Sequence, residues 1–120
     1  MTTHDIPWLS AAETAVAIKT KQVSPVEVVQ AYLARIERLD GHLHAYITVL
    51  RDEALAAARQ AEQAIMRGDK AGPLFGVPVA VKDQFWTKGI LTTNGSRVYR
   101  DFVPDEDATV MTRLQWARLA

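Results

Sequence analysis

The sequence predicts an α/β fold, and three observations carry this prediction. Serine-led start signals and apolar stripes indicate helices in the first 70 residues. A wholly apolar run at 77–81 indicates a strand that is buried on both faces. The composition, 48% hydrophobic and 23% charged over 120 residues, is that of one globular domain rather than a disordered segment.

The first two helices have matching start signals. Ser10 is followed three residues later by Glu13, and Ser24 is followed by Pro25 and then by Glu27. Each pair is a capping box, and proline is favoured at the first helical position. The apolar stripe of the second helix consists of Val26, Val29, Leu33, Ile36 and Leu39.

The region after the second helix is less regular. Asp40 and Gly41 are expected to end that helix, and residues 42–50 are expected to form a strand or an extended link. A third helix is predicted from about residue 52 to residue 67, because alanine, glutamate, glutamine and arginine dominate this stretch. Gly68 then provides the left-handed C-cap.

The second half of the chain changes character after the apolar run 77–81. Residues 83–106 are rich in Gly, Thr, Asn and Asp, which predicts a long loop of the kind that often carries function. A last helix is expected to begin near Asp107. Because one strong strand cannot form a covered sheet, we expect the chain to be the truncated beginning of a larger domain, cut within this helix. The alternative is that the last helix merely frays.

The charge balance excludes several classes of function. Fourteen lysine and arginine residues offset fourteen aspartate and glutamate residues, so the net charge is zero. A domain that binds nucleic acid directly, or a polybasic membrane anchor, would carry a basic excess. No signal-peptide pattern starts the chain, and no run approaches the roughly 18 apolar residues of a membrane helix. We therefore expect a cytoplasmic protein that contacts neither membrane nor nucleic acid.

No cofactor and no metal are expected. The chain has no cysteine, and no glycine-rich loop of the phosphate-binding type occurs. His42 and His44 would share one face of a strand and could together bind a metal ion. A third ligand at a useful spacing is missing, which favours solvated or hydrogen-bonded histidines instead.

Lys82 is the candidate catalytic residue, because it stands where the apolar run meets the long loop. Burial there would disfavour the charged form and lower the pKa of its amine. A neutral lysine can accept a proton from a serine hydroxyl. Asp83 follows on the opposite face of the expected strand and need not pair with Lys82. The alternative is an ordinary charge at the edge of a sheet.

Several motifs in a fixed order resemble the amidase signature family. They are SPVE at 24–27, GVPVAVKD at 76–83, TTNGS at 92–96 and DAT at 107–109. The resemblance runs from about residue 7 to residue 114. It implies the N-terminal part of the amidase signature fold, a mixed sheet flanked by helices. On this basis residues 1–120 are a partial amidase domain, with a helical lead-in at 8–70 and the start of the catalytic core at 72–120.

The resemblance also implies a reaction. Members of the family cleave or transfer amides with a Ser–cis-Ser–Lys triad, in which the lysine of the GVPVAVKD block takes a proton from the bridging serine. That lysine is Lys82 here. The substrate of a complete enzyme would be a small-molecule amide, and the complete enzyme is expected to be either a homodimer or joined to amidotransferase partner subunits.

The nucleophile is expected to lie outside this sequence. Only three serines occur, of which Ser10 and Ser24 are predicted helix caps, and the family does not use the loop of Ser96 for its nucleophile. We expect the isolated chain to be inactive. Two alternatives remain, namely the A subunit of an Asp-tRNA or Glu-tRNA amidotransferase that hydrolyses glutamine, and a non-catalytic helical interaction module.

Overall fold

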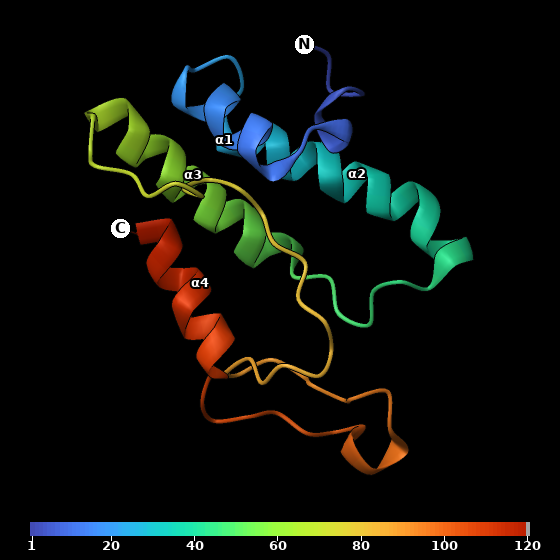
Figure 1. The fold of residues 1–120 in the computed structure, drawn as a ribbon. Coiled ribbons are helices and arrows are strands. Elements are labelled where there is room, and N and C mark those ends of the chain that lie inside the picture. The colour runs from blue at the N-terminus through green and yellow to red at the C-terminus, as the bar shows by residue number, and fades with distance from the viewer. Residues whose placement is uncertain (120) are drawn as a thin grey trace. The chain divides into compact units, whose positions relative to one another are not determined.

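The computed structural model describes the backbone of residues 1–119 and the side chains of residues 1–115. Residues 1–117 divide into two compact units, Met1–Pro78 and Val79–Ala117. The first unit is helical, and the second consists mainly of loops followed by a helix (Figure 1).

The first unit begins with a short 3-10 helix, η1 (Ile6–Trp8), and two α-helices, α1 (Ala11–Lys19) and α2 (Pro25–Leu43). The predicted capping boxes of α1 and α2 are both confirmed. The Ser24 hydroxyl accepts a hydrogen bond from the Glu27 amide at 3.1 Å, and the Glu27 carboxylate accepts one from the Ser24 amide at 2.8 Å. Ser10 and Glu13 make the same reciprocal pair.

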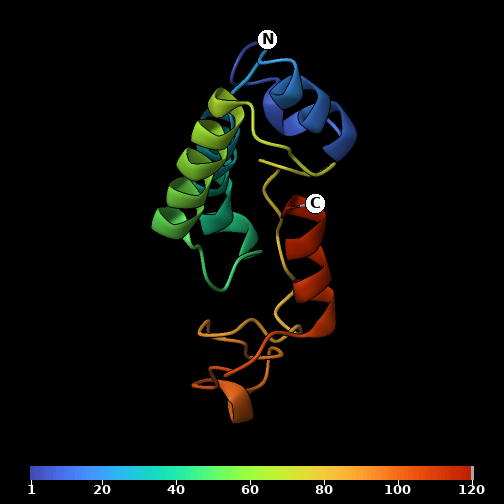
Figure 2. The ribbon, with the colours of Figure 1, turned by 90° about the vertical axis from the view of Figure 1, so that its left-hand side faces the viewer.

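Helix α3 (Arg51–Arg67) packs along α2, and the two helices lie side by side in Figures 1 and 2. Gly68 ends α3 with a φ of 79°, as predicted for a left-handed C-cap. Val29 and Leu33 of α2 are buried in one apolar cluster with Ala58 of α3.

A second apolar cluster joins η1, α1 and α2 to the segment that follows the loop after α3. Its buried members are Ile6, Ala17, Ile18, Val23, Val28, Ala31 and Val77. Gly76 reaches this cluster with a φ of 81°, in the left-handed region that favours glycine. A β-carbon at Gly76 would lie 3.0 Å from Cγ of Pro25 and 3.3 Å from Cδ1 of Ile18, so the chain approaches the helices as closely as a glycine allows.

The second unit holds a 3-10 helix, η2 (Arg97–Tyr99), and helix α4 (Thr109–Leu119). Backbone hydrogen bonds tie its loops into pairs, from Thr92 N to Phe102 O at 2.9 Å and from Gly89 N to Pro104 O at 2.9 Å. The Phe102 ring packs against Trp86, with 5.3 Å between the ring centroids. The predicted long loop and last helix are therefore present, with α4 beginning at Thr109 rather than near residue 107.

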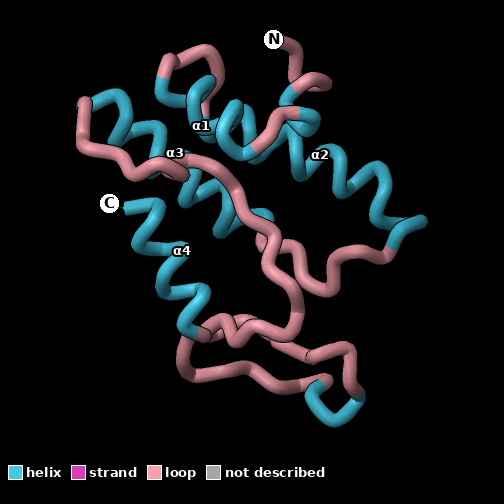
Figure 3. Tube along the Cα trace, viewed as in Figure 1, coloured by secondary structure: helices cyan, strands magenta, loops and turns pink. Residues whose placement is uncertain are grey.

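The expected α/β fold with a mixed sheet is wrong for the residues that the structure describes. Residues 1–119 contain helices and loops and no strand (Figure 3). A strand exists through hydrogen bonds to a neighbouring strand, and residues 79–81 make no backbone hydrogen bond to any described residue. The side chains of Val79 and Val81 are 47% and 38% exposed, so this run is not buried on both faces.

The end of α2 also differs from the prediction. The helix continues through Gly41 to Leu43, and His44, with a φ of 50°, is its C-cap. Asp40 holds the following loop, because its carboxylate accepts hydrogen bonds from the amides of Ala45 at 2.7 Å and Tyr46 at 3.2 Å. Residues 44–50 form a loop between α2 and α3 and not the strand that was one of the two forms expected.

Candidate functional site

Lys82 lies in the second unit, directly after the extended run 79–81. Its side chain is exposed, and within the described residues its amine makes no hydrogen bond and no ion pair. The burial expected from the sequence is therefore not provided by these residues. The exposure of Lys82 neither supports nor contradicts its role as a base, and this role remains a prediction.

Asp83, the next residue, is bound to a segment ten positions further along the chain. One carboxylate oxygen, Oδ1, accepts a hydrogen bond from the Thr93 amide at 2.9 Å, and the other, Oδ2, accepts one from the Thr93 hydroxyl. The Asp83 carbonyl accepts a third, from the Asn94 amide at 2.8 Å. The backbone carbonyl and the carboxylate of Asp83 therefore both bind the segment 93–94.

That segment is a tight turn. The Ser96 amide donates to the Thr93 carbonyl at 2.9 Å, and the two central residues, Asn94 and Gly95, have positive φ values of 52° and 65°. This is the pattern of a type I′ turn, for which Asn-Gly is the favoured pair. Thr93 is only 9% exposed, and its hydroxyl also accepts from the Gly95 amide at 3.1 Å.

The same contacts set the electrostatics of Asp83. Partial burial raises the pKa of the Asp83 carboxyl, because it disfavours the charged form. Hydrogen bonds from the hydroxyl and amide of Thr93, with a contribution from the Gly95 amide, favour the carboxylate and outweigh burial. The pKa of Asp83 therefore lies below its ordinary value, and the clamp is made by an ionised carboxylate.

Each of the three serines of the chain caps a helix. Ser10 and Ser24 belong to the capping boxes of α1 and α2, as predicted. Ser96 caps η2, where its hydroxyl accepts from the Val98 amide at 3.2 Å. All three hydroxyls therefore serve local backbone structure, and the geometry gives none of them a base.

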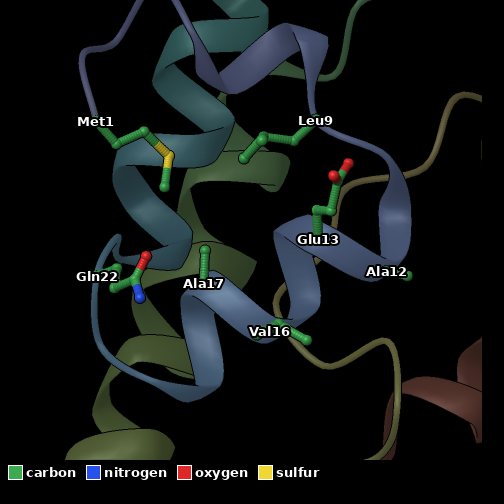
Figure 4. A pocket seen from close by; sticks show the side chains of 7 residues that line it. All are labelled: Met1, Leu9, Ala12, Glu13, Val16, Ala17 and Gln22. Atoms are coloured by element: carbon green, nitrogen blue, oxygen red, sulfur yellow. The ribbon is translucent and has the colours of Figure 1, made fainter.

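Neither the histidines nor the hollow beside α1 forms a reactive site among the described residues. His42 and His44 are exposed, and the described residues contain no group of three or more His, Asp or Glu residues that could hold a metal ion. A hollow of about 340 Å³ next to α1 is lined mainly by apolar side chains, with Met1 and Leu9 on opposite sides (Figure 4). Its one carboxylate, Glu13, is already engaged in the capping box.

The hydrogen bonds between Asp83 and Thr93 are not predictable from the sequence. Asp83 is expected there on the opposite face of a strand, and alternation along a strand says nothing about a partner ten residues away. The only local signal was Asn94-Gly95, since this dipeptide is typical of a type I′ turn, but it does not identify Asp83 as the partner of that turn.

Comparison with known proteins identifies the family. The family model described as Amidase matches residues 27–118, which include Lys82, Asp83 and Thr93. The chain belongs to the amidase family.

The relatives cover almost all of this chain but only part of their own lengths. The A subunit of glutamyl-tRNA(Gln) amidotransferase from Streptomyces coelicolor is 48% identical over 113 residues, which are 94% of this chain and 23% of that protein. A solved bacterial aryl acylamidase of the amidase signature family superimposes with a TM-score of 0.84 at 34% identity, over 93% of this chain and 24% of the other. A solved fatty acid amide hydrolase gives a TM-score of 0.87 at 25% identity, over 99% and 21%. The chain thus spans about a quarter of the length of the proteins it matches.

The structure adds one observation on membranes. Among residues 1–119, none of the helices has the length and apolar character that crossing a bilayer requires.

Proposed function

We propose that this chain is part of an amide-cleaving enzyme and supplies Lys82 as its general base. The observation that carries the proposal is the GVPVAVKD block at 76–83, which lies inside the match to the amidase family and ends on Lys82 and Asp83.

The proposed reaction moves one proton through two serines. The Lys82 amine takes a proton from a bridging serine, which takes one from the nucleophilic serine as that oxygen bonds to the amide carbon. The carbon–nitrogen bond then breaks, the leaving amine receives the proton, and water hydrolyses the acyl ester. Since Ser10, Ser24 and Ser96 all cap helices, both reacting serines are proposed to come from residues beyond these 120.

A second candidate is the A subunit of an aminoacyl-tRNA amidotransferase, which would use the same triad to release ammonia from glutamine. It is favoured by the relatives, because the Streptomyces coelicolor protein, at 48% identity, carries that name. For this candidate we propose partner subunits, and for the general amidase a homodimer. We place either enzyme in the cytoplasm, acting on a small-molecule amide without binding nucleic acid through this segment.

The role of Lys82 can be tested by grafting the 120 residues into a complete relative. The chain replaces the matching segment of the Streptomyces coelicolor protein, and ammonia release from glutamine is measured for the graft. Lys82→Ala is expected to lower kcat by roughly 10²- to 10⁴-fold, the usual contribution of a general base. Lys88→Ala is the matched control, because Lys88 is a second exposed lysine of the same unit.

The outcomes separate the alternatives. An active graft that loses its activity with Lys82→Ala and keeps it with Lys88→Ala supports the proposal. Equal activity of both variants would leave the chain as a non-catalytic module. Grafting the same 120 residues into the aryl acylamidase compares the general amidase with the amidotransferase subunit. Activity in the aryl acylamidase graft but not in the amidotransferase graft favours the general amidase.

A further inference from the structure

The backbone of Lys82 is held from one side only. The preceding residues, 79–81, make no backbone hydrogen bond to any residue that the structure describes. On the other side, the Lys82 carbonyl accepts hydrogen bonds from the amides of Gln84 at 2.7 Å and Phe85 at 3.1 Å. The place of Lys82 within its unit is therefore set by the turn that follows it.

The residues that follow Lys82 are held in place by Asp83. Two hydrogen bonds to its carboxylate and one to its carbonyl come from Thr93 and Asn94, so three contacts join residue 83 to the type I′ turn at 93–96. The Thr93 hydroxyl is the link between them. It donates to the Asp83 carboxylate and accepts from the Gly95 amide, which closes the turn onto the carboxylate.

We propose that Asp83 and Thr93 form a positioning pair that holds Lys82 in place for proton transfer. The inference rests on the proposed role of Lys82 and adds two residues that touch no reacting atom. Its physical basis is that a base acts only within hydrogen-bond reach, and that a displacement of about 1 Å can cost on the order of 100-fold in rate. The alternative is that the pair only stabilises a loop.

The substitution Thr93→Val distinguishes a role in positioning Lys82 from a role in stabilising the loop alone, because valine keeps the shape of threonine and removes the hydroxyl. In the grafted enzyme we expect Thr93→Val to lower kcat by roughly 10- to 100-fold while KM changes less than about twofold, because the base is misplaced and the substrate pocket is not. Thr93→Ser restores the hydroxyl and should recover most of kcat. Thr87→Val is the matched control, since the Thr87 hydroxyl donates only to the nearby Phe85 carbonyl.

The same variants are measured in the free 120-residue chain by amide hydrogen exchange. Thr93→Val is expected to speed exchange of the Asn94 amide by about tenfold, the cost of roughly one hydrogen bond, and Thr93→Ser to restore it. The exchange of amides in α2 serves as the folding control, because α2 belongs to the other compact unit. This readout does not depend on activity or on the graft.

The results distinguish this inference from the proposed function. Loss of kcat with Lys82→Ala and with Thr93→Val, and recovery with Thr93→Ser, supports the positioning pair. Faster exchange at Asn94 with an unchanged kcat shows a loop clamp only and overturns it. An unchanged exchange rate of the Asn94 amide in Thr93→Val would show that the Thr93 hydroxyl does not hold this segment, which also overturns the positioning pair. Full activity of Lys82→Ala defeats the proposed function, whatever the exchange rates show.

Discussion

Asp83 and Thr93, ten residues apart, are joined by both oxygens of one carboxylate, which receive the amide and the hydroxyl of Thr93. The preceding residues, 79–81, make no backbone hydrogen bond within the described residues. Asp83 therefore ties the TTNGS turn to the end of the GVPVAVKD block through its carboxylate and its backbone carbonyl.

The Asp83 clamp should weaken in acid. The folded-state pKa of Asp83 is lowered, so its ionised form adds stability above the pKa of the unfolded chain, and this stability is lost as the pH falls through the folded-state pKa. The protection of the Thr93 and Asn94 amides, measured as their exchange rate relative to the intrinsic rate of an unfolded amide at the same pH, should fall below about pH 4, where an unfolded aspartate is largely protonated.

Asp83→Asn is the control for this pH dependence. Its exchange at the two amides should be faster than that of the parent near neutral pH and should approach the parent rate in acid, since both then carry an uncharged side chain. Asp5 and Glu13 also have lowered pKa values, through hydrogen bonds from Thr2 and Ser10, but they are common to both proteins. A constant difference between the two proteins over the whole pH range would refute the ionised clamp.

Two glycine substitutions should change stability in opposite directions. Gly76→Ala places a methyl 3.0 Å from Pro25 Cγ at a φ of 81° and should cost about 1–3 kcal/mol of unfolding free energy. Gly41→Ala, inside α2 with nothing within 4 Å, should gain about 0.5–1 kcal/mol. Urea unfolding followed by helical circular dichroism measures both, and effects of the same sign would contradict the observed packing at Gly76.

The capping box of α2 should contribute measurably to the helical unit. Ser24→Ala removes the acceptor for the Glu27 amide and should lower the unfolding free energy by about 1 kcal/mol. Ser96→Ala, which affects only a three-residue 3-10 helix in the other unit, should leave that transition unchanged. An equal loss in the two variants would show that the effect is not due to the cap.

The parts of the fold that the sequence predicted are those decided over three or four residues. Ser24 and Glu27 are three positions apart, and a capping box needs nothing beyond them. Gly68 ends α3 for a similarly local reason. The end of α2 was misplaced because Asp40 binds Ala45 and Tyr46 instead of stopping the helix, a choice that its identity alone does not settle.

The parts that were missed depend on partners distant in sequence. The apolar run 77–81 suits a strand, but a strand requires a neighbour, and none is present among residues 1–119. For the candidate site, the family resemblance singled out Lys82, whereas the bond from Asp83 to Thr93 crosses a ten-residue loop that no periodicity describes.

The most direct test of the account is Lys82→Arg in the grafted enzyme, with ammonia release as the readout. Arginine keeps the positive charge and the length of the side chain but does not give up its proton in proteins. If Lys82 acts as a base, Lys82→Arg should lower kcat as far as Lys82→Ala, by roughly 10²- to 10⁴-fold, although the graft folds and binds substrate. A kcat within about twofold of the parent would show that Lys82 contributes charge or structure and not proton transfer, which would contradict the account.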